Sequence, residues 1–107
     1  MSAKPLRFRQ IARRDVDNAI EYCVCEAGDV VALRFIDALE HAYGRIRARP
    51  SAGSPRFGQV LDISGLRSIR LRRFPYLIFY LDHGSQIEIW RVLHAARDIP
   101  TWLQSDS

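Results

Sequence analysis

Two apolar segments near the C-terminus constrain the fold of this chain more than any other feature. Residues 76–81 (YLIFYL) form a nearly continuous apolar run, which is typical of a central strand that is covered on both faces. Residues 82–85 (DHGS) have the composition of a turn. Residues 86–93 (QIEIWRVL) have the composition of another strand. Together these segments predict a β-hairpin in the middle of a sheet.

Two amphipathic helices are predicted upstream of this hairpin. The first is expected to start at Asp15, where an acid complements the helix dipole, and to stop at Gly28. The second is expected to run from Asp29 to Pro50. Apolar residues recur in both at helical spacings of three and four: Val16, Ala19, Ile20, Cys23 and Ala27, then Ala32, Phe35, Ile36, Leu39, Ala42, Tyr43 and Ile46. Because so few residues join them, the helices should form an antiparallel hairpin.

The remaining segments complete an α+β order of β-α-α-β-β-β. Residues 6–9 alternate apolar and basic side chains and predict an N-terminal strand, and residues 66–72 predict another. Residues 50–58 have loop composition, 60–63 suggest a strand fragment or a packed loop, and 98–103 a short C-terminal helix or turn. We expect one domain over residues 1–107, with the helical hairpin packed on a three-stranded antiparallel sheet.

Arginine dominates the charge of the C-terminal half. The net charge is +4, and residues 65–81 contain no acid. This segment and the one after it supply the predicted basic surface: Arg67, Arg70, Arg72, Arg73, Arg91 and Arg97. Part of this set should lie on the sheet face away from the helical hairpin and leave a concave or open basic surface there. Such a surface attracts nucleic acid or an acidic protein segment. The alternative is a solvated strand face whose arginines only keep the domain soluble.

Several classes of protein do not fit this sequence. Cys23 and Cys25 lie two positions apart on a predicted helix and point to different faces, so neither a disulfide nor a metal site is expected. This cysteine usage fits a reducing, cytoplasmic compartment. The N-terminus lacks the apolar core of a signal peptide, and no apolar run is long enough to span a membrane.

His94 is the one candidate for catalysis, since the sequence has neither a phosphate-binding loop nor a nucleophile elbow. With Arg67 and Arg91 it could supply the acid–base and phosphate-binding groups of a metal-free ribonuclease. A histidine just past a strand end is more often structural. Tyr76 and Tyr80 could stack on bases, but alternate aromatic residues on a strand are more often core, and we expect core here.

Three stretches of the sequence carry a family resemblance. Gly65-Leu66-Arg67, residues 73–80 (RFPYLIFY) and residues 87–100 (IEIWRVLHAARDIP) resemble the ParE branch of the RelE/ParE bacterial toxins. The resemblance implies the toxin of a type II toxin–antitoxin system that inhibits DNA gyrase and needs no cofactor. It also implies a ParD-like antitoxin as partner, with operator DNA contacted only through that antitoxin.

The resemblance leaves two other functions open. One is a ribosome-dependent messenger endoribonuclease of RelE type, in which His94, Arg67 and Arg91 would be catalytic; the sequence lacks the lysines and the terminal tyrosine typical of those nucleases. The other is a basic binding module without toxicity. For the gyrase inhibitor, no residue is assigned to catalysis, and the residues expected to bind antitoxin or target are Arg67, Arg70, Arg72, Arg91 and Arg97.

Overall fold

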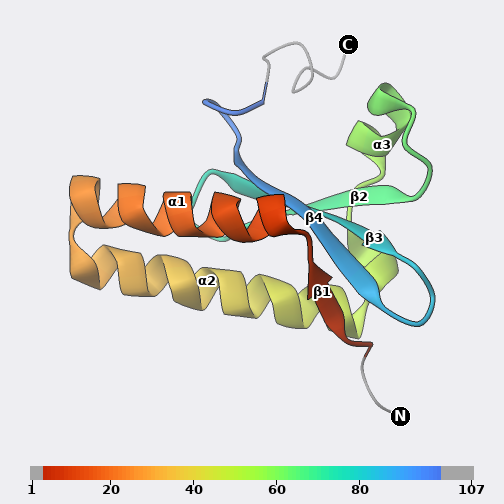
Figure 1. Ribbon diagram of the computed structural model, residues 1–107, viewed down its shortest axis with the longest axis horizontal. Helices are drawn as coiled ribbons and strands as arrows, with labels where there is room; N and C mark the ends of the chain where they lie inside the picture. Colours follow the sequence, from red (N-terminus) through yellow and green to blue (C-terminus); the bar gives the residue numbers. More distant parts are fainter. Residues whose placement is uncertain (1–3, 100–107) are drawn as a thin grey trace.

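A helical hairpin covers one face of a four-stranded sheet in the computed structural model of the protein (Figure 1). The structure describes residues 4–99. Along the chain, the elements are β1 (Leu6–Phe8), α1 (Gln10–Ala27), α2 (Asp29–Ala48), the 3-10 turn η1 (Pro50–Ala52), α3 (Arg56–Leu61), β2 (Leu66–Arg70), β3 (Tyr76–Asp82) and β4 (Ile87–His94). The predicted α+β class and its order of strands and main helices are confirmed.

The sheet has the strand order β1-β4-β3-β2, so the predicted hairpin of β3 and β4 lies at its centre. β3 is antiparallel to both β2 and β4, whereas β1 lies parallel to β4, with Leu6 beside Ile87. The register of β3 and β4 shifts after Phe79, which faces Arg91, while the next residue of β3 faces Ile89. Trp90 is therefore the extra residue of a β-bulge, which bends the strand locally.

Gly28 makes the sharp joint between the two long helices. Its φ of 89° lies in the region that favours glycine, and its N–H donates to the carbonyl of Val24. The buried face of α2 includes Phe35, Leu39 and Ile46, none more than 2% exposed. Cys23 packs against the same core, as predicted.

The other face of the sheet is also partly covered, which corrects the expectation of an open basic surface there. Phe57 of α3 packs edge-on against Phe79 at 5.2 Å, and Leu66 and Ile99 complete this smaller core. η1 and α3 replace most of the loop predicted over residues 50–58, and the strand fragment weighed for 60–63 is wrong because α3 runs to Leu61. Beyond α3, Ile63 packs against the smaller core, as the packed-loop alternative expects. Burial of Phe57 against the sheet overrides the loop-forming composition of the segment.

The first helix begins earlier than predicted. α1 starts at Gln10, after Arg9, and its first turn holds no acid. Asp15 lies in its second turn, where its carboxylate faces β4 instead of capping the helix. β2 ends at Arg70, two residues before the predicted end. Of the predicted C-terminal helix or turn, Asp98 lies in the turn after β4 and Ile99 follows it, and the rest lies outside the described residues.

Candidate functional site

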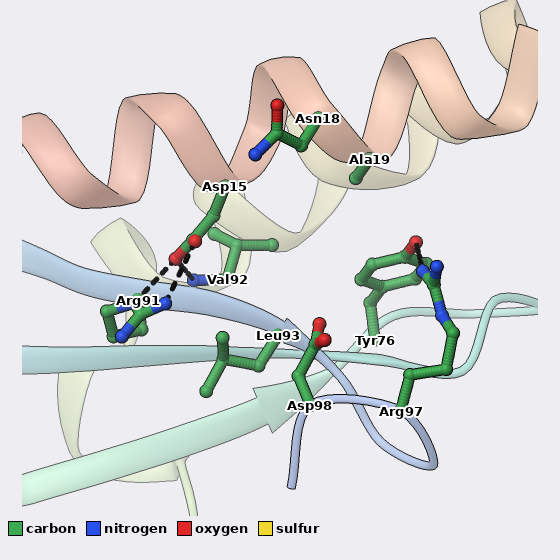
Figure 2. Close-up of a pocket in the computed structure, with 9 residues that line it drawn as sticks. All are labelled: Asp15, Asn18, Ala19, Tyr76, Arg91, Val92, Leu93, Arg97 and Asp98. Atoms are coloured by element: carbon green, nitrogen blue, oxygen red, sulfur yellow. Dashed lines mark hydrogen bonds and ion pairs between the residues drawn. The ribbon is translucent and has the colours of Figure 1, made fainter.

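Asp15 on α1 is joined to β4 by three hydrogen bonds (Figure 2). Nε and Nη2 of Arg91 donate to its two carboxylate oxygens at 2.7 and 3.0 Å. The backbone N–H of Val92 donates to Oδ2 at 3.1 Å. The Asp15 side chain is only 12% exposed. This bidentate pair is of the strong, directional kind, and it fixes α1 against the outer edge of β4.

A hollow of about 350 Å³ opens beside this ion pair, between α1 and the turn that follows β4. Arg91 and Arg97 both line it (Figure 2). Arg97 donates to the hydroxyl of Tyr76 at 2.8 Å, and its guanidinium lies 4.0 Å from the centre of the Tyr22 ring. The pKa of Tyr76 is raised by burial, although the charge of Arg97 opposes that rise. Two of the predicted arginines thus meet in one basic hollow.

His94 forms hydrogen bonds with the backbone of the turn after β4. Its Nδ1 accepts the N–H groups of Ala96 and Arg97 at 3.0 and 3.1 Å, which leaves the proton of the neutral ring on Nε2. Its own N–H donates to Oδ2 of Asp98 at 2.8 Å. Burial, and after it the charge of Arg97, lowers the pKa of His94, so the ring is neutral near pH 7. These contacts fit the structural role weighed for His94.

Arg67 and Tyr80 together hold the chain after α2. Nη1 of Arg67 donates to the carbonyl of Gly53 at 2.7 Å. The hydroxyl of Tyr80 donates to the carbonyl of Pro50 at 2.7 Å and accepts the N–H of Gly53 at 3.0 Å. Tyr80 is 0% exposed and Tyr76 6% exposed, as expected for core residues. Neither ring is available to stack on a base.

The two other arginines expected to bind antitoxin or target lie on separate surfaces. Arg70 is exposed at the end of β2, beside a hollow of about 310 Å³ that also contacts Phe57 and Leu77. Arg72 lies in the turn before β3, where it lines a different hollow against α2, of about 570 Å³. The predicted arginines therefore form no single site. Within residues 4–99, no group of histidine, cysteine and acidic side chains could hold a metal ion.

Comparison with known proteins identifies the family. A family model described as the ParE toxin of the type II toxin–antitoxin system, parDE, matches residues 6–99. The chain belongs to the ParE toxin family. As a ParE toxin it is one component of a type II toxin–antitoxin system, and such a system implies an antitoxin partner.

A solved structure supports the fold of this ParE toxin. A chain described as the chromosomal ParDE TA system from P. aeruginosa matches with a TM-score of 0.72 at 21% identity, over 86% of this chain and 96% of that chain. At this identity the likeness concerns the fold. A search of curated proteins found no match. In the described part of the toxin, neither long helix has the apolar length that crossing a membrane requires.

The prediction for Asp15 is wrong in its role. The sequence predicts a helix start there, whereas its carboxylate binds Arg91, which lies 76 positions further along the chain. The sequence does not show that Tyr76 and Asp98 are the partners of Arg97 and His94. The Asp15–Arg91 and Tyr76–Arg97 pairings join residues 76 and 21 positions apart and leave no local pattern. The usable signal for Asp15 was an acid on the face of α1 that its spacing turns toward the sheet.

Proposed function

We propose that this ParE toxin inhibits DNA gyrase in the bacterial cytoplasm and is neutralised by a ParD-like antitoxin, which alone contacts operator DNA. The observation that carries the proposal is the family match over residues 6–99, which includes most of the motif RVLHAARDIP of β4 and the following turn. A toxin of this kind acts by binding its target, and its residues need not perform chemistry.

The positions of the candidate catalytic groups favour inhibition by binding over RNA cleavage. A general base must reach a proton on its substrate, yet Nδ1 of His94 already accepts two backbone N–H groups. Arg67 is engaged by Gly53, and Arg91 by Asp15. Nδ1 of His94, Nη1 of Arg67, and Nε and Nη2 of Arg91 are thus occupied by contacts within the fold.

Exposed arginines give an antitoxin several places to bind. Arg70 and Arg72 lie on different sides of the sheet, each next to a partly apolar hollow. A flexible antitoxin segment with acidic and apolar residues could contact both by wrapping around the toxin, and it would become ordered on binding. Arg91 is less available, because its guanidinium is paired with Asp15.

The decisive experiment is brief induction of the toxin in bacteria, with separate pulse labelling of DNA and protein synthesis. We expect an early fall in DNA synthesis with filamentation and a DNA-damage response. Purified toxin should also inhibit supercoiling by purified gyrase, and added antitoxin should restore it. The His94→Ala variant should still inhibit gyrase if it folds, because His94 has a structural role.

Two other outcomes would contradict the proposal. An early fall in protein synthesis with messenger cleavage that is lost in His94→Ala would identify a RelE-type nuclease. Harmless expression of folded protein would identify a binding module without toxicity.

A further inference from the structure

The outer edge of β4 is only partly covered by another strand. β1 pairs with residues 87–89, and the last backbone bond between them runs from the N–H of Arg9 to the carbonyl of Ile89 at 3.1 Å. The chain then leaves the sheet to begin α1. Within the described residues, no strand pairs with this edge of β4 beyond Ile89, and part of the edge borders the hollow of about 350 Å³.

Two carboxylates occupy the place of the missing strand. The N–H of Val92 donates to Oδ2 of Asp15 at 3.1 Å, and the N–H of His94 donates to Oδ2 of Asp98 at 2.8 Å. Residues two apart in a strand direct their N–H groups to the same edge. Each carboxylate therefore accepts a hydrogen bond that a carbonyl of a neighbouring strand would otherwise accept (Figure 2 labels both acids).

An uncovered edge is a template for pairing with another chain, and proteins block such edges with charged side chains. We propose that residues 90–94 of β4 form a self-pairing edge, which the carboxylates of Asp15 and Asp98 keep closed. The partner that this edge fits is a second copy of the chain, paired antiparallel through the same residues. This inference does not depend on the target of the toxin.

The sequence of the edge is compatible with pairing to itself. A twofold axis at Val92 would place that residue opposite its own copy. Arg91 would then face Leu93, and His94 would face Trp90, the bulged residue at which the regular pairing ends. No two like charges stand opposite each other in this register, so cross-strand repulsion would not prevent it. What prevents it is the pair of acids, whose carboxylates already fill the hydrogen-bonding positions.

The test is the association state of the full-length Asp15→Ala/Asp98→Ala variant, measured by sedimentation velocity over a wide range of protein concentration. The wild type should sediment as a monomer throughout. The double variant should shift to a dimer as concentration rises. In the dimer, hydrogen exchange at the Val92 and His94 amides should slow with increasing concentration, because the partner strand then protects them.

Two control variants separate edge opening from general damage. Arg91→Ala removes the same ion pair but leaves the Asp15 carboxylate on the Val92 amide, so it should stay monomeric. Asp17→Ala removes an exposed acid of α1 that makes none of these contacts, and it too should stay monomeric. Dimerisation of Arg91→Ala to the same extent would overturn the proposal.

Other results would also overturn it. A folded double variant that remains monomeric at every concentration would show that the edge does not pair with itself. If circular dichroism shows the double variant to be unfolded, the single Asp98→Ala variant decides, since Asp98 is exposed and only the His94 amide is freed. That variant should dimerise more weakly, and a strictly monomeric, folded Asp98→Ala would then refute the proposal.

Discussion

Asp15 links α1 to β4, and its partner Arg91 lies 76 positions further along the chain. It lies on α1, binds the side chain of Arg91 and accepts the N–H of Val92 on β4. Because the carboxylate is largely buried, each of these donors would lose its partner without gaining full access to water if the carboxylate were removed.

Asp15→Ala should therefore destabilise the toxin by about 1–3 kcal/mol, the usual cost of leaving partly buried polar groups without partners. Urea denaturation at neutral pH measures this change as a lower midpoint with an unchanged slope. Asp17→Ala is the matched control on the same helix, and a surface change of this kind should alter stability by no more than about 0.5 kcal/mol. Equal effects of the two changes would contradict the assigned role of Asp15.

His94 gives a prediction about pH. Burial and the charge of Arg97 hold its pKa below 6.5 in the folded protein. As the pH falls, the unfolded chain therefore takes up this proton before the folded chain does. The contribution of neutral His94 to the free energy of unfolding is complete above pH 6.5 and is lost as the pH falls through the pKa of the folded state. In an NMR titration, Arg97→Gln should raise the pKa of His94 toward its ordinary value. An unchanged titration in that variant would contradict the assigned electrostatic cause.

At the scale of elements, α3 owes its position to close packing. Gly58 lies in this helix, and a Cβ there would meet the carbonyl oxygens of Leu66 and Ile63 at 2.5 and 2.9 Å. These are backbone atoms that cannot rotate away. The glycine is thus needed for the approach of α3 to β2, although glycine normally weakens a helix.

Gly58→Ala should destabilise the toxin by about 1–3 kcal/mol through overpacking, even though alanine is the better helix former. Gly44→Ala on α2 is the matched control, because a Cβ there meets nothing within 4 Å. That change should stabilise the protein by about 0.5–1 kcal/mol. Thermal unfolding of both variants checks the prediction, and a stabilised Gly58→Ala would refute the close contact.

The elements with strong periodicity were predictable, and those fixed by tertiary contact were not. The stripe of α2 and the apolar run of β3 carry their own signals, and both elements were predicted close to their observed positions. α3 was missed because its composition is that of a loop and only the burial of Phe57 makes it a helix. The start of α1 was misplaced because Asp15 resembles a cap in sequence but pairs with β4 in space.

At the scale of the whole molecule, one sheet joins two apolar cores. Ile78 faces the helical hairpin, and its neighbour Phe79 faces α3. Because adjacent residues of β3 belong to different cores, one core cannot be lost without disturbing the other. The chain should then unfold as one cooperative unit.

This cooperativity can be measured with Trp90, which packs near Phe79 with ring centres 6.4 Å apart. In a Trp102→Phe background, the fluorescence of Trp90 reports the smaller core, while far-ultraviolet circular dichroism reports mainly α1 and α2. The two urea transitions should coincide, as two-state unfolding requires. Separate midpoints would show that the cores unfold independently.

The surface charge of the whole toxin gives the last prediction. Arg70→Glu should weaken the binding of the antitoxin, and the loss should shrink as salt rises, because exposed charges are screened. Arg14→Glu on α1 makes the same change of net charge away from the sheet and serves as the control. Calorimetric titration of both variants measures the difference. Unchanged affinity of Arg70→Glu would exclude that part of the surface from the interface.

The site, like the fold, was predictable where residue type alone decides and not where tertiary contacts decide. The sequence shows which arginines β2, β4 and the turn after β4 carry, because the position of a residue type can be read directly from the chain. It could not show that Arg67 binds Gly53 or that Arg91 binds Asp15. Those partners are chosen by the three-dimensional arrangement, and they decide which arginines remain free to meet another protein.

The parallel pairing of β1 with β4 has a consequence for synthesis of the toxin. The first strand of the chain finds its partner only at residues 87–89, so the sheet is incomplete until that segment has left the ribosome. Loop closure over such a distance comes late in folding. A chain whose translation stops before β4 would lack both the neighbour of β1 and the anchor of Asp15. Interrupted synthesis would therefore yield fragments open to proteolysis instead of partially active toxin.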